Sequence, residues 1–248
     1  MSCVINQWTG RNGNNVLQIV RCIHYAESFG YKRVLIPKHN FFTNTEIKIY
    51  HNFTNVNDVK RGNFFSLKEY GIDDPSPKRM REIAQKYIVP ILSFNLPEKT
   101  DNKDILGIHI RSGDIFSNNP HSAYVPCPLK FYNIALSKYK EGYIVYEDTR
   151  NPCVNALIKE HKSQSKDVVT DIKTLCSFRN ICIGFGTFGF MIYLLSKCVE
   201  CVWLPDYVVG ELPLGKWECK VNVINLPGYI KVKEWRNSVE QRQLILNY

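Results

Sequence analysis

The sequence predicts an α/β protein built around parallel β-sheets. Between residues 105 and 226, short apolar segments of strand length alternate with segments whose apolar residues recur at helical spacing. Such alternation is typical of β–α–β units, whose strands run parallel. The chain has 248 residues, of which 44% are hydrophobic, enough for one large domain or two small ones. Because a charged connector, PEKTDNKD, occupies residues 97–104, we expect two domains, residues 1–100 and 101–248.

The first domain is expected to open with a turn, a helix and a strand. Residues 9–15, TGRNGNN, form a glycine-containing turn, and the apolar residues after it predict a helix over residues 15–29. RVLIP, residues 33–37, is then a short buried strand, whereas the polar stretch 41–62 predicts irregular structure or short strands. Serine and proline at positions 76 and 77 suit the start of a second helix, expected over residues 77–87.

The second domain is expected to alternate strand and helix throughout, before a polar tail. The predicted strands cover residues 105–110, 142–148, 167–170, 181–185, 198–205 and 221–226. The predicted helices cover residues 128–140, 151–162, 172–180 and 187–197. In such sheets ligands bind at the carboxyl ends of the strands, beside helix N-termini, so polar residues at those ends are candidate site residues.

Composition narrows the expected location and partners. The net charge of +9 suits anionic partners, although the lysines are scattered along the chain. No window approaches the roughly 18 uninterrupted apolar residues of a membrane helix, and the N-terminal residues lack the pattern of a signal peptide. We therefore expect a soluble, cytoplasmic protein without a membrane span. In such a location we expect the nine cysteines to be reduced and largely buried thiols. Cys198 and Cys201 form one C-x-x-C pair, but the second pair that a zinc site needs does not occur.

The first candidate site lies in DILGIHIRSGDIF, residues 104–116. His109 and Arg111 stand at the carboxyl end of a predicted strand and share one of its faces, because side chains alternate along a strand. An arginine binds phosphate oxygens in a bidentate manner, and Gly113 permits a close backbone approach. Asp114 either pairs with the arginine, binds a sugar hydroxyl or acts as a base. An ordinary Arg–Asp turn is the alternative.

Two glycine-containing turns are the other candidates. ICIGFGTFGF, residues 181–190, passes from a strand into a helix, and backbone N–H groups at a helix N-terminus bind anions. Tight strand–helix packing is the alternative there, since one G-x-G-x-x-G match is a weak signal. Residues 9–15 carry amide side chains, with a simple capping turn as the alternative. Asp171 follows the predicted strand 167–170 and could accept from a nucleobase.

Clustered carboxylates for a divalent cation are not evident in the sequence. No D-x-D occurs in the chain, and a cation that bridges nucleotide phosphates usually needs such a cluster. We therefore expect no metal and no other cofactor, with phosphate charge met by Arg111 and by the helix N-terminus at residues 186–189.

The three motifs, GRNGNNVLQ, HIRSGD and GTFGF, resemble in this order those of the superfamily of α1,2-, α1,6- and protein O-fucosyltransferases. The resemblance covers most of the chain except residues 40–68. It implies a GT-B-like fold, in which two Rossmann-type lobes with parallel sheets enclose a cleft. It also implies metal-independent, inverting transfer of a fucose-like sugar from a nucleotide sugar to a glycan hydroxyl. The first lobe would bind the acceptor, and the second the donor.

The resemblance also implies roles for individual residues. Arg111 would bind the donor β-phosphate, His109 would lie against the nucleoside, and Asp171 would contact the base. Further donor contacts would come from Gly186, Thr187, Phe188 and Gly189. The cleft and acceptor side would be formed by Arg11, Asn12, Gly13, Asn14 and Tyr124.

The sequence does not decide which residue is the catalytic base or which nucleotide sugar is the donor. Asp114, His121 and Asp73 are the candidates for the catalytic base, with Asp74 as the rival of Asp73. The second arginine of the family motif is Ser112 here, which leaves another donor possible, such as the UDP-xylose of a xylosyltransferase.

Two functions of other classes compete with a transferase: a nucleic-acid or polyanion binder, and a catalytically silent glycan-binding protein. The first lacks a recognised binding signature, so we expect a nucleotide sugar and a glycan as partners and no nucleic acid. A soluble enzyme of this kind is more typical of a bacterium or a large virus, in the latter case acting in the host cytoplasm.

Overall fold

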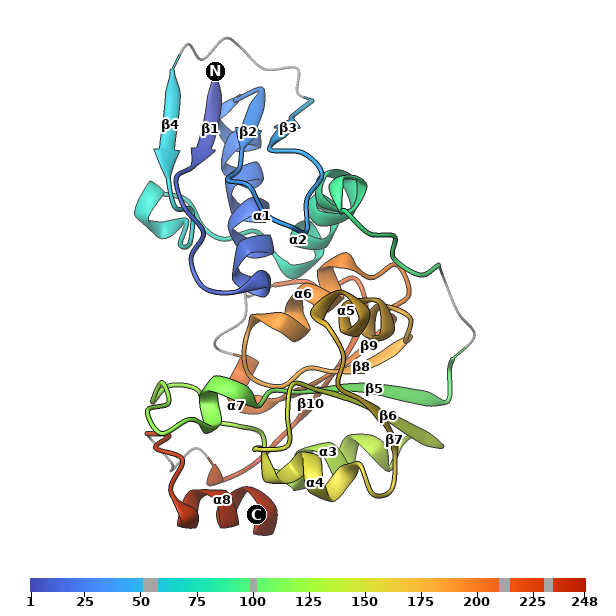
Figure 1. Ribbon diagram of the computed structural model, residues 1–248. Coiled ribbons are helices and arrows are strands. Elements are labelled where there is room, and N and C mark those ends of the chain that lie inside the picture. The colour runs from blue at the N-terminus through green and yellow to red at the C-terminus, as the bar shows by residue number, and fades with distance from the viewer. Residues whose placement is uncertain (51–57, 99–101, 210–214, 230–233) are drawn as a thin grey trace. The chain divides into compact units, whose positions relative to one another are not determined.

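The computed structural model describes residues 1–50, 58–98, 102–209, 215–229 and 234–248 (Figure 1). The chain divides into two compact units. The first comprises Met1–Asn95 and Pro213–Trp217, and the second comprises Leu96–Leu212 and Glu218–Tyr248. The expected boundary between residues 100 and 101 lies outside the described residues.

The first unit contains a four-stranded sheet in the order β3-β2-β1-β4. Its strands are β1 (Ser2–Ile5), β2 (Arg33–Leu35), β3 (Glu46–Lys48) and β4 (Val59–Gly62). β1 pairs in parallel with β2 and β4, whereas β3 runs antiparallel to β2. The sheet is therefore mixed rather than parallel throughout, because the link between β2 and β3 is too short for the crossover that parallel strands require.

Helices cover this sheet and continue from it. α1 (Asn12–Phe29) begins three residues before the predicted start, ends at Gly30 and packs on β1 and β2. A 3₁₀ turn, η1, spans Lys68–Tyr70. α2 (Pro77–Ile83) is capped by the Ser76 hydroxyl, which accepts a hydrogen bond from the Arg79 N–H at 3.3 Å, as predicted. The chain then continues through a π-helical turn, η2 (Ala84–Ile88), and a 3₁₀ turn, η3 (Val89–Ile91).

The second unit is built on a six-stranded sheet in the order β10-β9-β8-β5-β6-β7. Its strands are β5 (Ile105–Ile110), β6 (Glu141–Tyr146), β7 (Lys162–Gln164), β8 (Asn180–Cys182), β9 (Cys201–Pro205) and β10 (Lys220–Ile224). Every strand pair is parallel, which confirms the predicted α/β class for this unit. β5 lies inside the sheet, so its carboxyl end is flanked by neighbouring strands.

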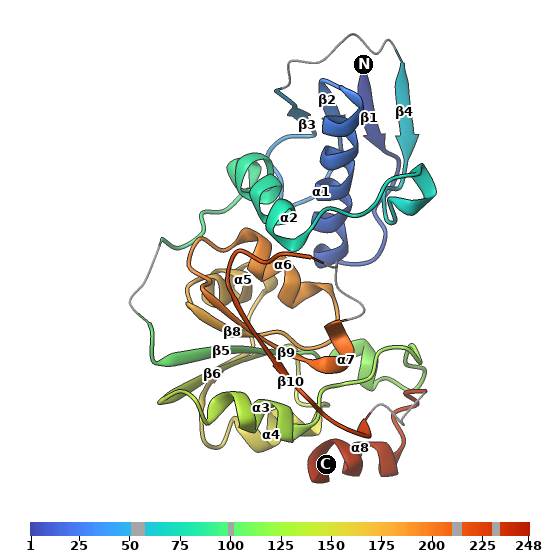
Figure 2. The ribbon, with the colours of Figure 1, turned by 180° about the vertical axis from the view of Figure 1, so that it is seen from behind.

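Helices lie on both faces of this sheet (Figures 1 and 2). α3 (Leu129–Leu136) and α4 (Pro152–Leu157) cover one face, and α8 (Val239–Asn247) packs against these two helices. α5 (Val168–Cys176) and α6 (Thr187–Leu195) pack together on the other, and the short α7 (Asp206–Val209) follows β9. The core includes Leu106, Ile108 and Ile110 of β5, all fully buried. These three side chains share one face of β5, and on the other face Gly107 lies against the ring of Phe178, as expected for a central parallel strand covered on both faces.

One predicted strand of the second unit is wrong. Residues 167–170 form no strand: the Asp167 side chain accepts hydrogen bonds from the N–H groups of Val169 and Thr170 and caps α5 instead. This capping outweighs the strand propensity of the two valines and the threonine. The tail after residue 226, which is expected to be polar, carries α8 and the buried Trp235.

The structure also bears on the expected absence of a membrane span and on the expected state of the cysteines. In the part of the chain that the structure describes, no helix is both long and apolar enough to cross a membrane. None of the nine cysteines forms a disulfide, and eight of them are buried.

Candidate anion-binding site at the carboxyl end of β5

β5 delivers the HIRSGD motif to one edge of the six-stranded sheet. His109 and Ile110 pair with Val145 and Tyr146 of β6, so Arg111 leaves the strand where both strands end. A short 3₁₀ helix, η4 (Gly113–Phe116), follows at once. The motif therefore occupies the edge at which parallel sheets bind ligands, as predicted.

The guanidinium of Arg111 lies between three partners in this unit. It forms an ion pair with Asp114, with Nη2 and Oδ2 3.1 Å apart. Its Cζ atom lies 4.4 Å from the centroid of the Tyr124 ring, a cation–π contact. A Cβ added to Gly186 would lie 2.7 Å from Nη1, so the arginine also lies against the turn that opens α6.

Gly186 is the N-cap of α6 and has φ +102°, a conformation that favours glycine. The Arg111 side chain thus lies beside the first N–H groups of a helix, and the helix dipole gives this end a partial positive charge. A guanidinium and a helix N-terminus side by side form a site suited to an anion.

His109 stacks against Phe188 in the first turn of α6. The ring centroids lie 4.4 Å apart, with the planes tilted by 35°. Burial, together with the nearby charge of Arg111, lowers the pKa of His109 to about 3. The imidazole is therefore neutral at physiological pH, and the pair offers an uncharged aromatic surface beside the cation.

Aromatic residues continue this surface around Tyr124. The Tyr124 ring contacts Phe185 at 5.1 Å and His121 at 4.8 Å between centroids. A small pocket opens behind the arginine. It is lined by His109, Arg111, Ile115, Pro126, Cys127, Tyr132, Asn151, Gly184 and Phe185.

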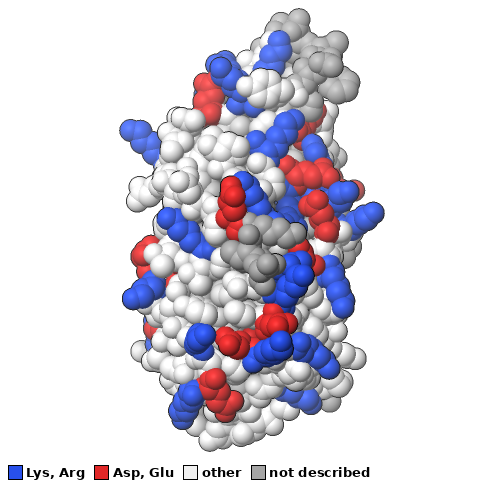
Figure 3. All heavy atoms as spheres, turned by 90° about the vertical axis from the view of Figure 1, so that its right-hand side faces the viewer, with Lys and Arg blue, Asp and Glu red and all other residues white. Residues whose placement is uncertain are grey.

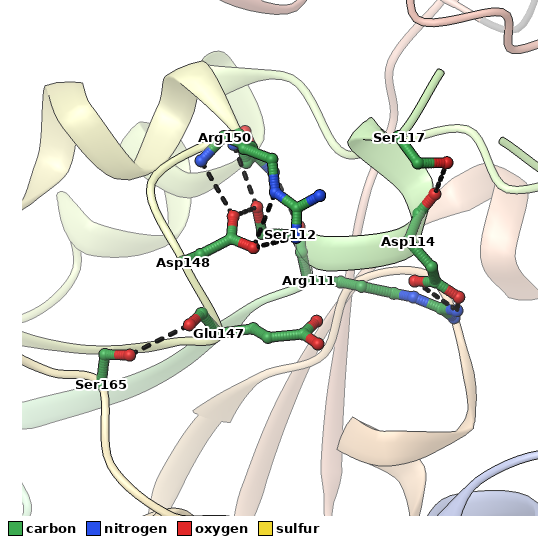
Figure 4. Close-up of polar contacts among 9 residues, drawn as sticks. Arg111, Ser112, Asp114, Ser117, Glu147, Asp148, Arg150 and Ser165 are labelled. Atoms are coloured by element: carbon green, nitrogen blue, oxygen red, sulfur yellow. Dashed lines mark hydrogen bonds and ion pairs between the residues drawn. The ribbon is translucent and has the colours of Figure 1, made fainter. Parts of the chain in front are cut away.

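A buried network holds the backbone beside Arg111 (Figure 4). Ser112 is fully buried, and its hydroxyl donates to Oδ1 of Asp148 and accepts from the N–H of Asn151 at 3.1 Å. The Asn151 amide donates to the carbonyl of Arg111 at 2.9 Å, and its oxygen caps α4 by accepting from the Cys153 N–H. The loop after β6 thereby fixes the residues that follow β5.

Asp148 connects this network to a second arginine. Arg150 donates from Nε at 2.8 Å and from Nη2 at 2.5 Å to Oδ2 of Asp148. Partial burial acts to raise the pKa of Asp148, but the hydrogen bonds from Arg150 and Ser112 outweigh it and lower the pKa to about 2. The carboxylate is therefore ionised throughout the physiological range.

Gly113 makes room for a further carboxylate. The residue has φ +58°, and a Cβ at this position would overlap the carboxylate of Glu147, which follows β6. Any other residue at position 113 would displace that side chain.

No protein-family model, curated protein or solved structure matches this chain. The assignment of a function therefore depends on the residues of the site and their geometry.

The structure brings together most of the second-unit residues predicted from the sequence. His109, Arg111, Asp114, His121, Tyr124, Gly186 and Phe188 form one connected group. Thr187 is the first residue of α6, beside this group. Gly189 instead packs against Ile183, the residue directly after β8, since a Cβ there would lie 2.7 Å from Cγ2 of Ile183. Close helix packing, the alternative considered for this turn, accounts for that glycine.

Asp171 does not follow a strand as predicted, because residues 167–170 belong to the start of α5. Asp171 lies in the first helical turn and accepts a hydrogen bond from Gln164, at the end of β7, at 2.8 Å. Burial raises the pKa of its carboxyl group. Its place is thus at the β7 edge of the sheet, whereas Arg111 follows the central β5.

The remaining predicted residues belong to the first unit. Arg11 is the N-cap of α1, where Asn12, Gly13 and Asn14 form the first turn. Asp73 is exposed, whereas its rival Asp74 forms an ion pair with Arg21 at 2.7 Å. Asp74 is therefore engaged in holding α1, and Asp73 is the more accessible carboxylate.

Sequence reasoning missed five residues of the second-unit site: Glu147, Asp148, Arg150, Asn151 and Phe185. For all but Phe185 the signal was present in EDTRN, residues 147–151, a polar run at the carboxyl end of the strand predicted over residues 142–148. The carboxyl-end rule that selected Arg111 applies equally to this run.

Two observations concern other ligands. Among the described residues, no group of three or more His, Cys, Asp or Glu side chains is arranged to hold a metal ion. On the face drawn in Figure 3, Lys and Arg side chains are interspersed with Asp and Glu rather than gathered in one stripe.

Proposed function

We propose that the protein is a metal-independent, inverting glycosyltransferase that moves a fucose-like sugar from a nucleotide sugar to a glycan hydroxyl. The observation that carries the proposal is the position of the Arg111 guanidinium, against Gly186 at the N-terminus of α6 and over the ring of Tyr124. The order of the GRNGNN, HIRSGD and GTFGF motifs, which resembles that of the fucosyltransferase superfamily, supports it.

In this proposal the second unit binds the donor. Arg111 and the N–H groups at the start of α6 receive the diphosphate, whose negative charge grows as the bond to the sugar breaks. The His109–Phe188 pair, which is uncharged, receives the nucleoside. Electrostatic stabilisation of the departing diphosphate is expected to be the larger part of catalysis.

The acceptor hydroxyl must lose a proton as it attacks the anomeric carbon from the face opposite the diphosphate. Asp114 and His121 of the second unit, and Asp73 of the first, are the candidate bases. Asp114 is ion-paired with Arg111 and so lies on the diphosphate side, whereas a base must reach the hydroxyl on the opposite face of the sugar. Its replacement by asparagine should abolish transfer and spare donor binding if it is the base.

The proposal extends to the arrangement of the chain. The two units would be the lobes of a GT-B-type enzyme, with the residues Arg11–Asn14 at the start of α1 on the acceptor side. The donor is open between GDP-fucose and another nucleotide sugar such as UDP-xylose, because a buried serine replaces the second arginine of the family motif.

A thermal-shift panel of GDP- and UDP-sugars tests donor binding, because a ligand that binds only the folded state raises Tm. The cognate nucleotide sugar should raise the Tm of the wild type and leave that of Arg111→Ala unchanged. Arg179→Ala is a matched control. Arg179 lies just before β8, at the opposite edge of the same sheet, and pairs with Glu200.

Transfer and hydrolysis should then be measured with the selected donor, with and without EDTA. Arg111→Ala should lose on the order of 10²–10³-fold in kcat, and EDTA should have no effect. Near-normal turnover by Arg111→Ala would refute the assignment. Donor binding without transfer or hydrolysis would instead favour a catalytically silent binding protein.

A further inference from the structure

We propose that Arg150 supplies a second cationic contact to the donor diphosphate, next to Arg111. The inference rests on the proposed function, because its ligand is the diphosphate of a nucleotide sugar. Four features support it: the burial of Ser112, the anchoring of Arg150, the shared edge of the sheet, and the separate ion pair that holds each arginine.

Ser112 is the residue that follows Arg111, yet it cannot contact a ligand. Its side chain is 0% exposed, and its hydroxyl is occupied by Asp148 and by the N–H of Asn151. The chain therefore presents one cation, Arg111, from the end of β5. A second cation at this edge has to come from a neighbouring loop.

Arg150 is anchored in the loop that follows β6. Its N–H donates to Oδ1 of Asp148 at 2.9 Å, and its Nε and Nη2 donate to Oδ2. The Asp148 carboxylate is itself fixed by the buried Ser112. The guanidinium is therefore held by only one of its edges, while 52% of the side chain is exposed to solvent. An arginine carries five N–H donors, so bonds from Nε and Nη2 leave donors for a ligand.

Arg150 and Arg111 stand at the same edge of the sheet. Their loops follow two adjacent parallel strands, and the residue after Arg150, Asn151, donates its amide to the carbonyl of Arg111 at 2.9 Å. In Figure 4 the Arg150 guanidinium lies over Asp148 on one side of Ser112, and the Arg111 side chain extends towards Asp114 on the other. The two arginines thus flank one short stretch of backbone.

Each arginine is held by its own carboxylate, Asp114 for Arg111 and Asp148 for Arg150. Glu147 beside Gly113 adds a third carboxylate, so the support for a diphosphate comes from the two separate guanidiniums and not from the net charge. These pairs keep both side chains in place without a ligand. Two guanidiniums suit a diphosphate better than a monophosphate, because each can donate to a different phosphoryl group.

Calorimetric titration of the full chain with UDP, GDP and the matching monophosphates tests the inference. In Arg150→Ala, affinity for the cognate diphosphate should fall about tenfold or more, as expected for a lost charge-assisted hydrogen bond. Affinity for the monophosphate should stay within about twofold of wild type. Arg150→Lys should recover part of the loss, and the control Arg179→Ala should bind both ligands like the wild type.

Three outcomes would overturn the inference, and they bear differently on the proposed function. Diphosphate binding by Arg150→Ala at wild-type strength, with binding lost in Arg111→Ala, would remove the role of Arg150 and leave the proposed function intact. Equal losses for diphosphate and monophosphate would point to a general effect on the site rather than a second phosphate contact. Failure of the wild type to bind any of the nucleotides would overturn both.

Discussion

The guanidinium of Arg111 lies over the ring of Tyr124, with Cζ 4.4 Å from the ring centroid. The contact joins β5 to the loop before α3 and orients the arginine without occupying its N–H donors. An aromatic ring can hold a guanidinium in this manner while the N–H donors at the edge of the guanidinium stay available to a phosphate.

Replacement of Tyr124 should separate the role of the ring from that of the hydroxyl. Tyr124→Leu should weaken binding of the nucleoside diphosphate by about 0.5–2 kcal/mol, the usual range of a cation–π contact. Tyr124→Phe keeps the ring and should bind within about twofold of the wild type. Calorimetric titration measures both, and equal loss in the two variants would assign the effect to the hydroxyl instead.

Gly186→Ala should impair both stability and donor binding. The added Cβ would lie 2.7 Å from Nη1 of Arg111, and an alanine at φ +102° is strained by about 1–3 kcal/mol. Gly228→Ala is the matched control, because Gly228 also has positive φ, +83°, but nothing lies within 4 Å of its added Cβ. We expect both variants to lose stability in urea denaturation and only Gly186→Ala to lose nucleotide affinity. Unchanged affinity in Gly186→Ala would show that the turn does not position Arg111.

Asn151→Ala should destabilise the fold and weaken donor binding together. Asn151 is 1% exposed, caps α4 and binds the Arg111 carbonyl, so the variant loses a cap and a buried hydrogen bond. The cost should be about 2–4 kcal/mol in the free energy of unfolding. Asn151→Ser restores the cap but cannot hold the carbonyl, and should regain about 1 kcal/mol of stability without regaining affinity.

Asp167→Ala serves as the control for this pair of variants. Asp167 caps α5 through the N–H groups of Val169 and Thr170, and neither bond reaches Arg111. It should lose about 0.5–2 kcal/mol of stability and keep wild-type affinity. If Asp167→Ala weakened nucleotide binding as strongly as Asn151→Ala, the link from Asn151 to Arg111 would not be the cause.

His109 should contribute to acid destabilisation. Its pKa in the folded protein is about 3, below the ordinary value of 6.5, so between these pH values the unfolded state binds more protons. Stability should therefore fall as pH falls from 6.5 towards 3, with a slope of up to about 1.4 kcal/mol per pH unit from this group.

The contribution of His109 can be isolated by comparison with His109→Gln, which cannot titrate. The pKa values of His24 and His39 are also lowered by burial, so only the difference between the two proteins reports on His109. Urea denaturation at several pH values should give a shallower decline for His109→Gln. Parallel curves for the two proteins would mean that the imidazole takes up a proton in the fold as readily as in the unfolded chain.

The fold of the second unit could be predicted from the sequence because local and tertiary preferences agree there. Every strand of the parallel sheet except β7 corresponds to a largely apolar run, and the four inner strands, β9, β8, β5 and β6, have neighbours on both sides. The strand predicted at residues 167–170 is wrong because its β-branched residues follow a capping aspartate. The two hydrogen bonds that this aspartate accepts stabilise a helix instead. In the first unit, β1 is only four residues long, and β3 pairs across a short link, so neither leaves a periodic signal.

The residues at the centre of the candidate site could be predicted from the sequence, whereas the residues that hold them in place could not. Arg111 and Gly186 stand out because an arginine and a glycine at strand ends are unusual in otherwise apolar segments. Asp148 accepts from the Ser112 hydroxyl and Asn151 donates to the Arg111 carbonyl, both just after the neighbouring strand β5. A single sequence does not reveal which strands are neighbours. The order β8-β5-β6, which makes that contact possible, is a property of the assembled sheet.

The contribution of residues 213–217 to the first unit has a consequence for how the protein is made. The N–H of Lys78, in the first turn of α2, donates to the carbonyl of Lys216 at 2.8 Å. During synthesis, the ribosome has to reach residue 216 of 248 before this partner exists. The N-terminal portion therefore completes this contact only after most of the chain has been translated. A fragment that ends at residue 95 would lack this segment.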